Sequence, residues 1–226
     1  MKEIIFKDLG LTDYQQAWNI QKQMHSNVLQ SKTNQNRIGG ENYLLFCEHP
    51  HVYTLGKSGS ENNLLINHLQ LQAKNATFYK TDRGGDITYH GPGQIVGYPI
   101  LDLVSFGIGV KEYVSRIEET IIETLKEYSV KSERLEGATG VWLDSKSKNA
   151  RKICAIGVKV SRAITMHGFA FNINTDLSYF NYINPCGFTD KTVTSLEKEL
   201  GKKQDTEEVK TLLKKNFKLV FGVEVQ

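Results

Sequence analysis

The sequence predicts an α+β fold, because helix-like and strand-like segments follow one another without the regular strand–helix–strand repeat of doubly wound proteins. Three strand-like runs are consecutive, at 140–143, 152–160 and 166–173. The last two alternate between apolar and polar residues well enough to pair as a hairpin. A length of 226 residues and a hydrophobic fraction of 39% suit one folded domain, which we expect to span residues 1–226.

The first half of the chain is predicted to hold one long helix among short strands. Thr12 can cap this helix, and Tyr14, Ala17 and Trp18 can share its apolar face. The expected elements are, in chain order, a strand at 4–6, a helix at 12–30, a polar loop at 31–41 and strands at 42–48, 52–55 and 77–80.

The second half is predicted to hold three further helices. In the first of them, at 110–128, apolar residues recur at helical spacing, namely Tyr113, Ile117, Ile121 and Leu125. Asp205 can cap the last one. Besides the three consecutive strands, the expected elements are a strand at 99–103 and helices at 192–200 and 207–217.

Composition and charge exclude several classes of protein. The formal net charge of +3 is far from the strongly basic face of a nucleic-acid binder. No apolar run approaches the ~20 residues of a membrane span. The N-terminal residues are charged where a signal peptide needs an apolar core. We therefore expect a soluble, cytoplasmic protein with no nucleic-acid or membrane partner, and a monomer, since no heptad pattern is present.

Cys186 is the candidate nucleophile among the three cysteines. Their spacing matches no zinc signature, so no metal is expected. Cys47 and Cys154 lie in apolar strand-like runs and are interpreted as core residues. Cys186 follows a proline and precedes Gly187, an arrangement that leaves the sulfur open to a substrate. An inert, half-buried turn cysteine is the alternative that this pattern leaves open.

A nucleophilic cysteine needs a neighbour that favours its thiolate, because a free thiol has a pKa of ~8.5. Lys152 opens a buried strand and would be held firmly there. As an ammonium it could stabilise the thiolate, and as a neutral amine it could accept a proton. A solvated lysine at a strand end stays an alternative. The other candidate partners are His49, His51, His90 and His167.

A glycine-rich segment at 83–94 indicates a binding loop. It contains neither of the glycine motifs that bind nucleotides. Gly84 and Gly85 allow close approach of the backbone to a ligand, and Pro92 makes the following turn rigid. Since polar residues are common in any loop, a solvated hairpin is the other interpretation.

Four blocks of sequence resemble the lipoyl(octanoyl) transferases, the acyltransferases of lipoate biosynthesis. They are EHPHVYTLGKSG at 48–59, RGGDITYHGPGQIVGYP at 83–99, KICAIGVKVSRAITMHGFAFNIN at 152–174 and INPCG at 183–187. The resemblance implies a biotin/lipoyl-ligase-like mixed sheet flanked by helices. It also implies that octanoyl-acyl carrier protein donates an octanoyl group to a lysine of a lipoyl domain.

The resemblance also assigns roles to residues of this chain. Cys186 would be the nucleophile that carries the acyl group as a thioester, and Lys152 the lysine that tunes it. No cofactor or metal is required, because a thioester is already activated. Substrate would be bound by Arg83, Gly84, Gly85, Asp86, Ile87, Thr88, Tyr89, His90, Ala155, Ile156, Gly157, Gly168, Phe169 and Ala170.

Three rival functions remain at this stage. The first is an ATP-dependent lipoate or biotin ligase, which needs the lysine but not Cys186. The second is a non-catalytic protein that binds lipoyl domains or acyl carrier protein. The third is a cysteine hydrolase, with His90 or His167 beside the sulfur. For the transferase, the implied acceptors are the lipoyl domains of 2-oxoacid dehydrogenases and the glycine cleavage H protein.

Overall fold

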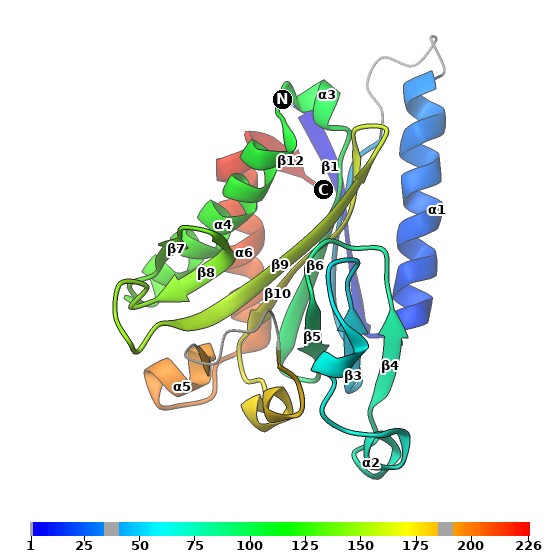
Figure 1. Cartoon of the computed structure of the whole chain (residues 1–226). Coiled ribbons are helices and arrows are strands. Elements are labelled where there is room, and N and C mark those ends of the chain that lie inside the picture. The colour runs from blue at the N-terminus through cyan, green and yellow to red at the C-terminus, as the bar shows by residue number, and fades with distance from the viewer. Residues whose placement is uncertain (1, 34–40, 185–191) are drawn as a thin grey trace.

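A large mixed β-sheet forms the centre of the protein, seen in a computed structural model that describes residues 2–33, 41–184 and 192–226 (Figure 1). Its strands lie in the order β12-β1-β2-β6-β10-β9-β8-β7, and β11 pairs with β9. These strands are β1 (Lys2–Leu11), β2 (Tyr43–Glu48), β6 (Gln94–Ile100), β7 (Glu133–Leu135), β8 (Ala138–Leu143), β9 (Arg151–Ser161), β10 (Ile164–Asn172), β11 (Thr192–Val193) and β12 (Val223–Val225).

A second, three-stranded sheet lies beside the first in the order β4-β3-β5. β3 (Val52–Leu55) pairs parallel with β4 (Thr77–Lys80) and antiparallel with β5 (Ile87–His90). The bounds of β3 and β4 are those predicted from the sequence. β5 comes from the glycine-rich segment, so this small sheet fixes one side of the candidate binding loop.

Helices cover both faces of the large sheet, and the predicted α+β class is confirmed. The long helix α1 (Tyr14–Thr33) lies on one face, and α4 (Val110–Glu127) and α6 (Thr206–Phe221) lie together on the other (Figure 1). The shorter helices are α2 (His68–Ala73), α3 (Leu103–Phe106), α5 (Leu196–Leu200) and the 3-10 helices η1 (Glu61–Asn63) and η2 (Leu177–Tyr182).

Strand β2 shows why a central strand of this sheet is a continuous apolar run. Leu44 and Phe46 pack into the core on the α4–α6 side, whereas Tyr43, Leu45 and Cys47 pack into the core on the α1 side. Successive side chains of a strand point to opposite faces. Both faces are covered here, so every one of these five residues is buried, at a gain of roughly 1.5–3 kcal/mol for each large side chain.

The N-terminus of α1 differs from the prediction. Thr12 does not cap the helix, because its hydroxyl donates to the carbonyl of Leu9 at 2.6 Å. The Asp13 carboxylate accepts instead from the amides of Gln15 and Gln16, at 2.9 and 3.1 Å, which is the usual capping arrangement. The helix runs to Thr33, and residues 34–40 of the predicted loop lie outside the described part of the chain.

Two further boundaries predicted from the sequence were wrong. The helix expected at 192–200 is shortened to Leu196–Leu200, because 192–193 form β11 beside β9; the amide of Thr194 then donates to the Lys152 carbonyl at 2.9 Å. The strand expected at 99–103 begins earlier, as β6, and Asp102 caps α3 immediately after it. The Asp205 cap of α6 is confirmed.

Candidate functional site

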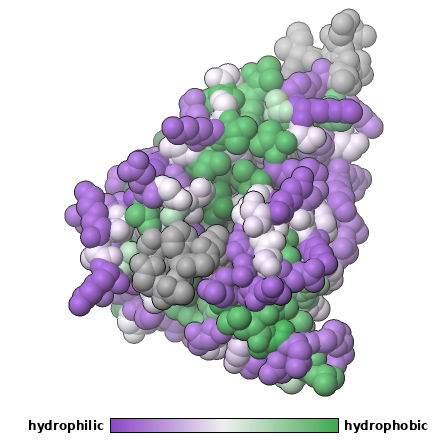
Figure 2. All heavy atoms as spheres, in the orientation of Figure 1, coloured by the Kyte–Doolittle hydropathy of each residue, from purple (hydrophilic) through white to green (hydrophobic). Residues whose placement is uncertain are grey.

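A cavity of about 830 Å³ lies on the α1 side of the large sheet, within the ~300–1,000 Å³ usual for small-molecule sites. Its walls come from the glycine-rich segment, the β9–β10 hairpin, the β7–β8 turn and η2. In a space-filling view, hydrophobic residues gather in the middle of the face that presents this hairpin, and hydrophilic residues border them (Figure 2).

Small residues on the predicted β9–β10 hairpin leave room for the cavity. The hairpin is present, with Ala155 opposite Ala170 and Gly157 opposite Gly168, and all four residues line the cavity. Larger side chains at these four positions would fill the space above the sheet. The hairpin therefore supplies an open and largely apolar floor.

The glycine-rich segment docks directly on this hairpin. The amide of Gly84 donates to the Val158 carbonyl at 2.9 Å. A Cβ at Gly157 would come within 2.9 Å of the Gly84 oxygen, so glycine is needed there for close contact. Gly85 has a φ of +85°, a backbone region that glycine enters readily. The segment is thus a wall of the cavity rather than a freely solvated hairpin.

Arg83 anchors the same segment from inside the protein. It is buried, and its guanidinium donates to the Thr54 carbonyl at 2.6 Å, to the Thr54 hydroxyl at 2.9 Å and to the Gly84 carbonyl at 3.0 Å. A buried charge is tolerated only where it is well hydrogen-bonded. Arg83 therefore joins β3 to the glycine-rich loop.

His90 is held in one tautomer. The Gln94 amide donates to Asn172 Oδ1 at 2.9 Å, which turns its own oxygen toward His90 Nδ1 at 2.8 Å. Nδ1 therefore carries the proton, and Nε2 faces the Thr54 hydroxyl at 3.3 Å. Burial holds the pKa of His90 well below its usual range. His90 thus lines the cavity as a neutral imidazole with both nitrogens engaged.

His167 lines the cavity from β10 and is tied to the loop before Arg83. Its Nε2 donates to Asp82 Oδ1 at 2.7 Å, and its amide donates to Gln21 of α1 at 2.9 Å. The hydrogen bond from His167 and the Lys159 ammonium lower the pKa of Asp82. His167 also has a φ of +56°. It joins α1, β10 and the glycine-rich loop at one point.

Lys152 lines the cavity because β9 contains a β-bulge. Val141 of β8 pairs with Cys154, but the next residue, Trp142, pairs with Lys152, so Ile153 is an extra residue on β9. Ile153 and Cys154 both pack into the core on the α4–α6 side. Lys152 is thereby turned to the same side as Ala155, as bulges near sites often do.

Two of the cysteines are core residues, as predicted. Cys47 and Cys154 are fully buried, and burial raises the pKa of both thiols. Cys186, the predicted nucleophile, lies outside the described residues. Asn184, two residues before it in the chain, lines the cavity, and so does Thr192 on the far side of the undescribed 185–191.

Most residues that the sequence nominated gather around this one cavity. Lining it are Arg83, Gly85, Asp86, Ile87, Thr88, His90, Lys152, Ala155, Ile156, Gly157, Gly168, Phe169 and Ala170. Gly84 and Tyr89 are not among the lining residues. Tyr89 is buried and its hydroxyl lies 2.7 Å from His51 Nδ1, so it supports the small sheet.

Sequence reasoning passed over Tyr14, Tyr98, Trp142 and Asn172, which also line the cavity. Tyr98 and Asn172 lie within the sequence blocks at 83–99 and 152–174, and Trp142 lies on the predicted strand that precedes Lys152. Within residues 2–33, 41–184 and 192–226, no three His, Cys, Asp or Glu side chains gather closely enough to hold a metal ion. Among the helices in those ranges, none has the length and apolar character needed to cross a bilayer.

Comparison with known proteins decides the family. The lipoyl protein ligase A/B catalytic domain family matches residues 13–218. The octanoyltransferase of Christiangramia forsetii is 54% identical over 100% of this chain and 98% of its own length. This chain belongs to the octanoyltransferase family. A second octanoyltransferase, from Flavobacterium psychrophilum, is 55% identical over 99% of both chains. Since octanoyltransferases are acyltransferases, the chain is an enzyme of that class.

Solved structures confirm the predicted ligase-like fold of this chain. A lipoate protein ligase from T. acidophilum with bound lipoic acid has a TM-score of 0.68 at 13% identity, over 100% of this chain and 88% of that one. LipL1 of P. falciparum, in complex with lipoate, has a TM-score of 0.71 at 15% identity, over 99% and 66%. At such low identity the likeness concerns the fold alone.

Proposed function

We propose that this protein moves an octanoyl group from acyl carrier protein to a lysine of a lipoyl domain, through a thioester on Cys186. The observation that carries the proposal is the cavity itself. Lys152 and the apolar floor of the β9–β10 hairpin share it. Asn184, two residues before Cys186 in the chain, lines the same space.

In the first half-reaction the Cys186 thiolate attacks the thioester carbonyl of octanoyl-acyl carrier protein. The tetrahedral oxyanion collapses, the new C–S bond remains, and the carrier thiolate leaves. It takes up the proton of the Lys152 ammonium, so that Lys152 is neutral when the second half-reaction begins. One thioester replaces another, so no ATP or metal is needed to drive the step. The Lys152 ammonium lowers the free energy of the attacking thiolate by proximity of opposite charge.

In the second half-reaction the neutral ε-amine of the acceptor lysine attacks the octanoyl-enzyme. An amide bond forms, the C–S bond breaks, and Cys186 leaves as a thiolate. The attacking nitrogen must lose one proton, and a neutral Lys152 side chain is the base proposed to take it. The acceptors in this scheme are the lipoyl domains of 2-oxoacid dehydrogenases and the glycine cleavage H protein, all in the cytoplasm.

The proposal is tested by intact-mass analysis of the protein mixed with octanoyl-acyl carrier protein in the absence of ATP. We expect a mass gain of one octanoyl group that hydroxylamine reverses. The Cys186→Ala variant should gain nothing. The matched control, Cys47→Ala, should be acylated like the wild type, because Cys47 is fully buried away from the cavity.

Two outcomes would contradict the thioester route. An octanoyl adduct that persists in Cys186→Ala would place the acyl group elsewhere. Octanoylation of a lipoyl domain that requires ATP and proceeds without Cys186 would move the chain to the ligase reaction. Acylation of the enzyme with no transfer to a lipoyl domain would support the first half-reaction but contradict the proposal that a lipoyl domain is the acceptor.

A further inference from the structure

Trp142 presents its ring to the Lys152 side chain. The Lys152 Nζ lies 4.6 Å from the centre of that ring, and the two residues are direct neighbours across β8 and β9. The face of an indole ring is negative and attracts a cation at this distance. Trp142 therefore gives the Lys152 ammonium a preferred place at the cavity wall.

The Trp142 ring is itself fixed. The side chain is buried, and its indole Nε1 donates to the Ala138 carbonyl at 2.8 Å. A buried aromatic ring with its polar atom hydrogen-bonded has little freedom to turn. Because both Trp142 and Ala138 line the cavity, the contact with Lys152 is made within the site.

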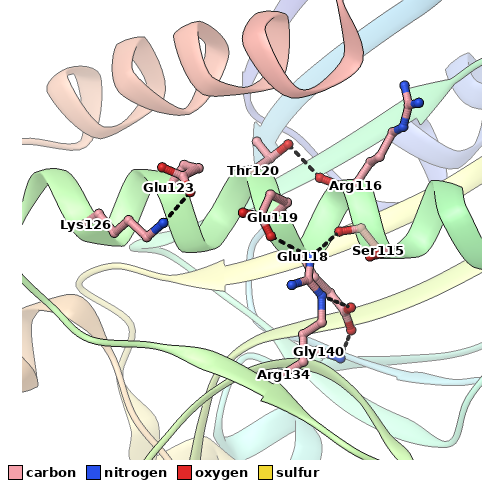
Figure 3. Close-up of polar contacts among 9 residues, drawn as sticks. All are labelled: Ser115, Arg116, Glu118, Glu119, Thr120, Glu123, Lys126, Arg134 and Gly140. Carbon is pink, nitrogen blue, oxygen red and sulfur yellow. Dashed lines mark hydrogen bonds and ion pairs between the residues drawn. The ribbon is translucent and has the colours of Figure 1, made fainter.

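The strand beneath Lys152 is held by a buried carboxylate. The amide of Gly140 donates to Glu118 Oε1 at 3.0 Å, and Arg134 Nε donates to Glu118 Oε2 at 3.0 Å (Figure 3). A Cβ on Gly140 would come within 3.4 Å of two methylenes of Lys152, so the lysine stem lies directly over this glycine.

We propose that Trp142 is a positioning residue for Lys152. The Trp142 ring holds the Lys152 ammonium at the cavity wall, where the lysine stem lies over Gly140 and beside the β9 bulge. The inference rests on the proposed function, in which Lys152 serves the Cys186 thiolate. If the ring holds the ammonium there, removing the Trp142 ring should make the Cys186 thiolate less stable. This effect should be seen only when Lys152 is present.

The test is the pH dependence of Cys186 alkylation by iodoacetamide, followed as mass gain on the peptide that carries Cys186. Trp142→Leu should raise the midpoint of the profile and lower the rate at pH 7 by about threefold to thirtyfold. Trp142→Phe keeps a ring, although a less attractive one, and should give a smaller shift. In a Lys152→Met background, Trp142→Leu should change nothing more.

Phe6→Leu is the matched control. Lys214 Nζ lies 4.7 Å from the Phe6 ring, so this variant removes a similar contact on β1, among residues that do not line the cavity. It should leave the midpoint unchanged. Melting curves show which variants are folded, and Trp142→Phe carries the test if the leucine variant is not.

Two results would overturn the inference while leaving the proposed function intact. In one, Lys152→Met raises the midpoint but neither Trp142 variant does. In the other, Trp142→Leu has the same effect with and without Lys152. Failure of the proposed function would give a different result. Octanoyl-acyl carrier protein would then not acylate Cys186, regardless of how iodoacetamide alkylation depends on pH.

Discussion

At the scale of single residues, Gly140 combines a positive φ with a close backbone neighbour beside Lys152. Its φ is +124°, and a Cβ would lie 2.6 Å from the Cys154 carbonyl oxygen. Backbone atoms cannot give way as a flexible side chain can, so the cost of an added Cβ is both conformational and steric. Glycine is therefore required at this position by the backbone.

We predict that Gly140→Ala lowers the free energy of unfolding by about 3 kcal/mol or more. Gly137→Ala is its control in the same hairpin, since Gly137 also has a positive φ, of +76°, but no atom within 4 Å of the added Cβ. That variant should cost only about 1–2 kcal/mol. Urea denaturation measures both, and equal losses would show that the contact with Cys154 does not matter.

At the scale of elements, Arg134 and Glu118 connect the β7–β8 hairpin to α4. Arg134 donates to Glu118, to Glu119 at 2.8 Å and to the Ser115 carbonyl at 2.7 Å (Figure 3). The two glutamates differ in burial, since the Glu118 side chain is 10% exposed and that of Glu119 38%. Arg134 itself is 40% exposed, so the difference between the two glutamates lies in the buried Gly140 amide, which donates to Glu118.

Glu118→Ala should therefore destabilise the protein by about 1–3 kcal/mol, because it leaves the buried Gly140 amide without its acceptor. Glu119→Ala should cost less than about 1 kcal/mol. Thermal melting of the two variants compares them directly. Similar losses for both would mean that the hairpin is held by packing rather than by the Glu118 carboxylate.

The elements also show which parts of the fold were predictable. β3 and β4 were predicted to the residue, because each is a short run rich in β-branched or aromatic residues. The β9–β10 hairpin followed from local alternation. The position of β11 was missed, since a two-residue strand is defined by its partner β9 rather than by its own sequence. Trp142 was passed over for the same reason, because its contact with Lys152 depends on cross-strand register.

At the scale of the whole molecule, two neutral histidines lie deep between the sheets and α1. Burial lowers the pKa of His49 to about 4 and that of His90 well below its usual range. In the unfolded chain both would titrate near 6.5. Below that pH the unfolded chain binds protons that the folded protein does not accept, so acid favours unfolding.

We predict that the free energy of unfolding is steady above about pH 7 and falls as the pH drops from about 6.5 toward 4. Each buried histidine contributes up to about 1.4 kcal/mol per pH unit in that window. Urea denaturation at pH 7.5, 6 and 5 measures the slope. His49→Gln should reduce it, whereas His68→Gln, on the exposed face of α2, should not. A flat profile down to pH 5 would contradict the prediction.

The bulge at Ile153 changes which residues of β9, even-numbered or odd-numbered, face the core. From Cys154 onward, even-numbered residues face the α4–α6 core, and Lys152 would join them if the alternation were unbroken. The extra residue moves every position before it to the opposite face. If β9 kept Ile153 but paired without the bulge, the unbroken alternation would direct Lys152 into the apolar interior. Deleting Ile153 would instead leave Lys152 on the cavity face, because it would then come directly before Cys154. The bulge therefore lets β9 place two successive residues, Ile153 and Cys154, in the core and still keep Lys152 on the cavity face.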